Sequence, residues 1–187
     1  MVPAYLQAVY AVTDQAKAFG HRVLPNGTEL AGHVPHRAPE AWLHELFAPL
    51  APIELAAWEQ ALGASLPPAL RAFYLHHNGL NLFSCTLALH GRRSGYERTG
   101  DNARQPFDMD DLNRYRRGGP TAGRLYLAGN ADVLWLSLDL RTHAGQRTTA
   151  EGTVVQEWVS FEEMLVAEVQ RVAQGFDARG RPQSLNG

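Results

Sequence analysis

The histidines His33 and His36 have a spacing at which two imidazoles could bind one metal ion. The pair lies in a segment rich in proline and glycine, and no cysteine or cluster of carboxylates accompanies it. A zinc site needs three or four ligands that a rigid frame holds in place. We therefore predict no metal at these histidines and no metal site elsewhere in the chain.

His77 and Cys85 are the next candidates, as a general base and as a nucleophile. His77 follows His76 at the end of an expected helix and lies on its apolar stripe, which favours a structural role. Strand-like alternation places Cys85 on one face with Phe83 and Leu87. Burial on that face would raise the pKa of the thiol and keep it protonated. We predict an inert core thiol at Cys85 and no catalytic role for His77.

Asp132 and Asp139 flank one expected strand and could be taken for a pair of catalytic carboxylates. Their odd spacing places them on opposite faces of that strand, so the strand alone cannot bring them together for acid–base work. The chain also contains no phosphate-binding G-x-x-x-x-G-K loop, no G-x-S-x-G elbow and no ordered dinucleotide-binding loop. The sequence thus predicts that the protein is not an enzyme and uses no cofactor.

The segment from Arg92 to Arg117 is unusual, with seven arginines, five acidic residues and interleaved tyrosines. Arginine and tyrosine are favoured in the energetic centres of protein interfaces, although both are also common in plain solvated loops. The intermixed acids argue against phosphate binding. We predict a partner-binding site made of Arg92, Arg93, Tyr96 and Arg98, and a solvated loop remains the alternative.

Two helices joined by a proline turn are the clearest elements that would position these residues. Apolar residues recur at helical spacing around Trp58, and Gly63 offers a left-handed stop. Pro68 suits the first position of the second helix. We expect helices over residues 53–62 and 68–77 that pack together, with Trp58 in the core.

The rest of the chain predicts an α+β fold. Residues 133–140 have leucines on one face and a partly apolar opposite face, which is typical of a central strand covered on both sides. Ser160 and Glu163 form a capping box at the start of the last helix. We predict a mostly antiparallel sheet of about four to six strands flanked by helices. The other expected elements are helices at 3–19, 40–47 and 108–117, strands at 82–89, 124–128 and 153–159, and loops at 20–39 and 142–152.

These motifs, in this order, resemble the SUKH superfamily, which includes the yeast Smi/Knr cell-wall assembly regulators and many bacterial immunity proteins. The first part of the family pattern reads here as Trp58–Glu59, Leu62–Gly63, Leu66–Pro67, Phe73 and Asn78–Gly79. Its later parts correspond to residues 127–132, 136–139 and 160–165. One departure is Ala131, which stands where the family often has glycine.

The resemblance implies a SUKH-like domain over residues 51–176, preceded by an N-terminal helical extension at 1–50 and followed by a mobile tail at 177–187. It also implies structural roles for Asp132 in a turn and Asp139 at a strand end. The implied function is that of a non-catalytic protein-binding domain. The first expectation is a bacterial immunity protein that neutralises a cognate toxin by occlusion. The alternatives are a regulatory or scaffolding domain like the yeast relatives, or a small-ligand sensor.

Composition bounds the setting in which such a protein would act. The net charge of −2 favours neither a nucleic-acid partner nor a highly acidic inhibitor. No apolar run is long enough for a membrane span, and the N-terminus lacks the pattern of a signal peptide. A single cysteine cannot form an internal disulfide. We expect a cytoplasmic protein with a protein partner, and the oligomeric state stays open.

Overall fold

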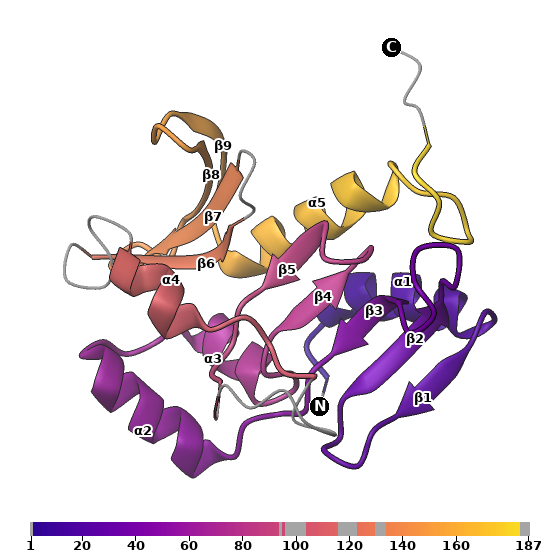
Figure 1. Ribbon diagram of the computed structural model, residues 1–187. Coiled ribbons are helices and arrows are strands. Elements are labelled where there is room, and N and C mark those ends of the chain that lie inside the picture. The colour runs from indigo at the N-terminus through magenta and orange to yellow at the C-terminus, as the bar shows by residue number, and fades with distance from the viewer. Residues whose placement is uncertain (1, 94, 96–103, 116–122, 130–133, 184–187) are drawn as a thin grey trace.

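The computed structural model describes residues 2–93, 95, 104–115, 123–129 and 134–183. Helices and strands follow one another along this part of the chain in an α+β arrangement (Figure 1). In order they are α1 (Leu6–Lys17), β1 (His21–Val23), β2 (Glu29–His33), β3 (Trp42–Leu46), α2 (Pro52–Leu62), α3 (Pro68–Tyr74), β4 (Leu80–Leu82), β5 (Leu87–Leu89), α4 (Met109–Tyr115), β6 (Arg124–Gly129), β7 (Leu134–Asp139), β8 (Gly145–Thr149), β9 (Val154–Trp158) and α5 (Phe161–Ala173).

The described strands form two antiparallel sheets, with the orders β1-β2-β3-β4-β5 and β6-β7-β8-β9. The predicted α+β fold with antiparallel pairing is confirmed. The strands do not join one sheet as expected: β5 ends beside β6, where the His90 backbone N–H donates to Leu127 O at 2.8 Å. Helix α5 contacts β5, β8 and β9, so it spans the region where the two sheets meet (Figure 1).

The N-terminal region differs from the prediction. The loop expected at 20–39 contains the β1–β2 hairpin, and the helix expected at 40–47 is strand β3. The hairpin turns at Gly27, which has a φ of +83°. β3 pairs with β2 on one side and β4 on the other, and this pairing overrides the helix-like spacing of its apolar residues. Residues 1–50 therefore share a sheet with β4 and β5.

The strand expected at 82–89 is in fact a hairpin, which changes the position of Cys85. Leu82 pairs with Leu87 across a tight turn, and Phe83, Ser84 and Cys85 all have positive φ. Residues other than glycine rarely adopt a positive φ, so a turn made of these three residues is not expected from their types. The alternating apolar pattern therefore predicted a continuous strand. The prediction of a buried Cys85 is wrong, because the residue is exposed at the tip of this turn.

In the described part of the C-terminal half, the structure follows the prediction except in one connection. Strand β8 occupies part of the loop expected at 142–152. Gly145 begins β8, and a Cβ there would lie 2.9 Å from Met164 Sδ, so glycine lets α5 pack closely on the sheet. The capping side chain of Ser160 accepts from the Glu163 backbone N–H at 3.2 Å, as expected. Beyond α5, Asp177 Oδ1 accepts from the backbone N–H groups of Arg179 and Arg181, which closes a turn.

Trp58 links the helices of the core, as its place on the helical stripe predicted. Its side chain is 1% exposed and packs edge-to-face on Tyr74 with ring centroids 5.0 Å apart. Its indole Nε1–H donates to Asp110 Oδ1 at 2.7 Å. Tyr74 in turn donates its hydroxyl to His90 O at 2.8 Å. The indole therefore ties α2 to α3 by packing and to α4 by a hydrogen bond.

We expect Trp58→Ala to lower the free energy of unfolding by about 3–5 kcal/mol, because it leaves a large cavity. Trp58→Phe keeps most of the packing and removes the hydrogen bond to Asp110, so its effect should be smaller. Urea denaturation followed by circular dichroism measures both. An alanine variant as stable as the wild type would contradict a core role for this indole.

Candidate partner-binding site

The predicted arginine segment begins where two parts of the backbone come into very close contact. The Asn78 side chain holds Arg92 at both backbone groups: Asn78 Oδ1 accepts from Arg92 N–H, and Asn78 Nδ2 donates to Arg92 O, each at 2.7 Å. A Cβ on Gly91 would lie only 2.3 Å from Asn78 O, and one on Gly79 would lie 2.6 Å from Leu89 O. Glycines at both positions allow this approach, and the clamp fixes where Arg92 leaves the fold.

The side chains of Arg92 and Arg93 reach in different directions from this anchor. Arg92 Nη1 donates to Glu54 O in the first turn of α2 at 3.0 Å. Arg93 Nε donates to Gly95 O at 2.8 Å. Both residues are half-buried.

A polar hollow of about 420 Å³ lies beside these arginines. We call it the arginine hollow; Arg92, Arg93, Arg104, Glu54, Asn26 and Thr28 are among the residues that line it. Arg104 forms an ion pair with Glu45 and donates to Glu40 O at 2.7 Å. Asn26 Nδ2 donates to Arg104 O at 3.3 Å, which links the β1–β2 turn to the hollow.

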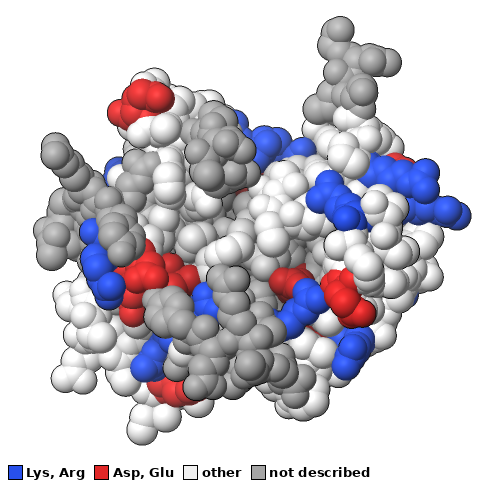
Figure 2. All heavy atoms as spheres, in the orientation of Figure 1, with Lys and Arg blue, Asp and Glu red and all other residues white. Residues whose placement is uncertain are grey.

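The charges around the hollow are mixed. Arg104 is compensated by Glu45, and Glu54 is another acidic residue that lines the hollow. Among the described residues on the face seen in Figure 2, basic and acidic atoms lie side by side in several places. A protein surface with its own alternating charges fits this arrangement better than a chain of phosphates does.

The structure brings together Arg92 and Arg93, two of the four predicted binding residues. Tyr96 and Arg98 lie outside the described residues. Sequence reasoning missed the contributions of Asn26, Asn78 and Arg104. The Asn78–Gly79 pair was noted as part of the family pattern, and no local signal indicates that the amide side chain would reach Arg92, fourteen positions later.

The residues first considered for chemistry have other roles. Desolvation in its tight turn, helped by Glu45, raises the pKa of Cys85 to about 11, which keeps the exposed thiol protonated at neutral pH. His33 Nε2 lies 2.8 Å from Pro39 O. Asp139 Oδ1 accepts from the backbone N–H groups of Arg141 and Thr142, which lowers its pKa and closes a strand-end turn. Asp132 lies outside the described residues.

His77 is held in a structural contact. Its Nε2 lies 2.9 Å from the Tyr10 hydroxyl, which joins α3 to α1. Burial is the main cause that lowers the pKa of His77 to about 4, and the neighbouring His76 adds to it. The ring is therefore neutral at pH 7. Within the described ranges, no three His, Cys, Asp or Glu side chains gather as a metal ion would require.

The sequence profile of the SMI1/KNR4 family (SUKH-1) matches residues 49–178, well over half of the chain. The chain belongs to the SMI1/KNR4 family. The match confirms the resemblance to the SUKH superfamily, whose members are generally non-catalytic and fit immunity or regulatory roles. In this SMI1/KNR4 protein the match begins after β3, so α1 and the first three strands precede it.

No curated protein matched the chain. None of the helices in the described part of the chain combines the length and apolar character of a membrane span.

We expect Gly91→Ala to destabilise the protein by about 1–3 kcal/mol, because the new methyl group would collide with the Asn78 backbone. Gly95→Ala is the matched control, since a Cβ at Gly95 meets nothing within 4 Å. Thermal unfolding of the two variants compares them directly. Equal melting temperatures would contradict the close approach at the clamp.

The pKa of His77 predicts a loss of stability in mild acid. An unfolded histidine has a pKa of about 6.5. As the pH falls from there toward 4, the unfolded state takes up the proton before the folded state does, so the free energy of unfolding decreases. We expect about 1–3 kcal/mol from this ring, and a similar trend from buried His44, whose pKa burial also lowers to about 4.

His77→Gln should therefore make the dependence of stability on pH shallower between pH 6.5 and 4. The exposed His36→Gln variant is the control and should retain the wild-type dependence. Urea denaturation at a series of pH values measures the effect. A His77→Gln profile parallel to that of the wild type would contradict the assignment.

Proposed function

We propose that this SMI1/KNR4 protein is a bacterial immunity protein that binds a cognate toxin in the cytoplasm and neutralises it by covering its functional surface. The family membership supports a protein-interaction role of the immunity or regulatory kind. The observation on which the proposal depends is the arginine hollow: two predicted binding residues, Arg92 and Arg93, line one polar hollow and leave the fold at a fixed point.

The mechanism we propose is steric and needs no cofactor. The Asn78 clamp fixes the backbone at Arg92, so little conformational entropy is lost there when a partner binds. The half-buried guanidinium groups can donate forked hydrogen bonds to carboxylates of the toxin. A partner held in this way would have its own surface covered, and no bond in either protein would need to change.

The second candidate is a regulatory or scaffolding domain, which the same family membership supports. The two functions differ in their partner: the first predicts the product of an adjacent toxin gene, and the second predicts a housekeeping protein. A third candidate is a small-ligand sensor, supported by the volume of the arginine hollow, which falls within the usual range for small-molecule sites. Co-purification from the native cell distinguishes the first two, and ligand screening addresses the third.

Combining Arg92→Ala, Arg93→Ala and Tyr96→Ala should weaken toxin binding by a few kcal/mol, the usual range for the loss of interface hot spots. The fold should survive, because Arg92 and Arg93 contribute side chains to the edge of the hollow and not to the core. Calorimetry with the product of the adjacent toxin gene measures the change in affinity.

Arg22→Ala combined with Arg141→Ala is the matched control, because both arginines are exposed and neither lines the hollow. This control should bind the toxin as the wild type does. Undiminished affinity in the triple variant would exclude the arginine hollow as the interface. Equal losses of affinity in the triple variant and in the control would show that the effect comes from the change in overall charge.

A further inference from the structure

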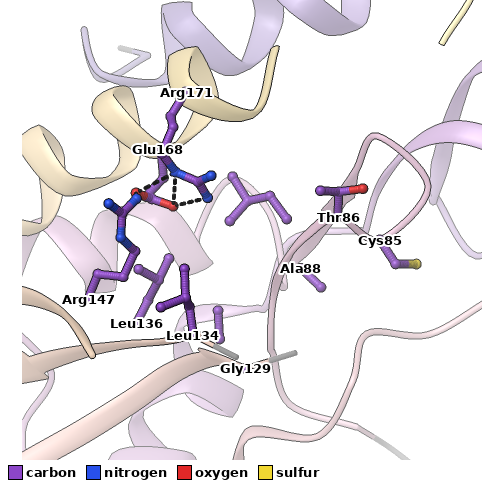
Figure 3. A pocket seen from close by; sticks show the side chains of 11 residues that line it. Cys85, Thr86, Ala88, Gly129, Leu134, Leu136, Arg147, Glu168 and Arg171 are labelled. Carbon is purple, nitrogen blue, oxygen red and sulfur yellow. Dashed lines mark hydrogen bonds and ion pairs between the residues drawn. The ribbon is translucent and has the colours of Figure 1, made fainter. Parts of the chain in front are cut away.

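A second hollow lies where the two sheets meet α5 (Figure 3). We call it the intersheet hollow. It encloses about 200 Å³ and shares no lining residue with the arginine hollow. Its apolar part includes Ala88 after the β4–β5 turn and Leu134 and Leu136 of β7, and its charged wall is formed by Arg147, Glu168 and Arg171.

The charged wall consists of two arginines that share one carboxylate. Arg147 Nη1 lies 2.7 Å from Glu168 Oε1, and Arg171 Nη2 lies 2.7 Å from Glu168 Oε2. Glu168 is only 2% exposed, whereas Arg171 is 46% exposed at the rim. The wall therefore has one positive charge in excess beside an apolar surface.

Donor groups on this wall remain available. Arg147 is 15% exposed, and its Nε is a buried donor for which the described residues provide no hydrogen-bond acceptor. A guanidinium has five N–H groups, and Glu168 receives one contact from Arg147, through Nη1. This Nε–H is itself closed off from the hollow, so an incoming carboxylate would accept from the Nη groups of Arg147 and from Arg171 at the rim.

The size of the hollow distinguishes between kinds of occupant. Sites for small molecules usually enclose about 300–1,000 Å³, and this hollow is smaller. One aliphatic side chain of a partner protein would fit better, with a neighbouring carboxylate placed on the arginines. The combination of apolar lining and excess positive charge thus specifies an apolar residue next to an acidic one.

We propose that the intersheet hollow binds a segment of a partner protein in which an aliphatic side chain adjoins an aspartate or glutamate. The aliphatic group lies against Leu134, Leu136 and Ala88, and the carboxylate accepts from Arg171 and Arg147. The choice of a protein as the ligand depends on the proposed protein-binding function, but the hollow and its residues are separate from the arginine hollow.

The test uses the full chain and synthetic peptides, so its outcome does not depend on the toxin. The probe is acetyl-Gly-Leu-Glu-Gly-amide, and the signals are the Nε–H resonances of Arg147 and Arg171 in nitrogen-15 NMR spectra. We expect saturable shifts of both signals. Replacing the glutamate of the peptide by glutamine, or its leucine by glycine, should weaken binding about tenfold, because each removes one half of the recognition.

Arg171→Gln removes an exposed arginine that pairs with an acid three positions earlier, and Arg147 remains to compensate Glu168. Arg114→Gln is the matched control, because Arg114 forms the same kind of pair with Asp111 on α4 and lines neither hollow. Arg171→Gln should weaken binding about tenfold, and Arg114→Gln should leave it unchanged. Circular dichroism is the check that both variants fold.

Three results would overturn the proposal. Peptide shifts that never saturate would exclude the site. Equal affinity of Arg171→Gln and the wild type would exclude the arginine wall as the acceptor of the carboxylate. Binding of hexanoate without binding of the peptide would show a small-molecule carboxylate site instead of a protein-binding one. None of these three results depends on whether the Arg92, Arg93 and Tyr96 triple variant loses toxin binding. The two proposals can therefore fail separately.

Discussion

The close contact of Asn78 and Gly79 with Gly91 is the constraint on which the rest of the structure depends. The Asn78 backbone N–H is 3.2 Å from both Phe47 O and Ala48 O, and Phe47 N–H donates to Gly79 O at 3.3 Å. The ends of α3 and β3 and the chain after β5 therefore meet at one point, where no side chain could fit between the backbones. The backbone position at which Arg92 leaves the first sheet is therefore fixed by these contacts and not by the loop that follows it.

The elements that the sequence predicted well are those whose signals are local. Trp58 lies on a helix with a proline start and a glycine stop, and Gly63 has the left-handed φ of +68° that such a stop requires. The elements that were missed depend on distant partners. Residues 42–47 have a spacing compatible with a helix, and only pairing with Glu29 to Ala31 and with β4 makes β3 a strand. The turn at Phe83 to Cys85 contains no glycine or proline, so nothing in the sequence marked it.

The same distinction applies to the candidate sites. Arg92 and Arg93 could be predicted from the composition of their segment, because residues adjacent in sequence are also adjacent in space. Arg104 and Asn26 reach the same hollow from separate segments, which no spacing rule relates. Glu168 was detectable in part: it lies three residues after Leu165 on the buried stripe of α5, and a carboxylate there requires a cation. The sequence could not identify Arg147 as that cation, because β8 was expected to be a loop.

The energetics of the Arg147–Glu168–Arg171 group support the binding role that we propose for it. Burying an ion pair costs desolvation energy that the attraction between the charges only partly offsets, and apolar replacements of such groups are often neutral or stabilising. A single arginine would be enough to compensate Glu168, yet two contact it. Arg171 adds a positive charge at the rim of an apolar hollow, and Arg147 keeps a buried Nε–H for which the described residues provide no acceptor. A partner carboxylate at the rim would offset the excess positive charge, which is the feature of this group that the proposed binding role explains and that stability alone does not.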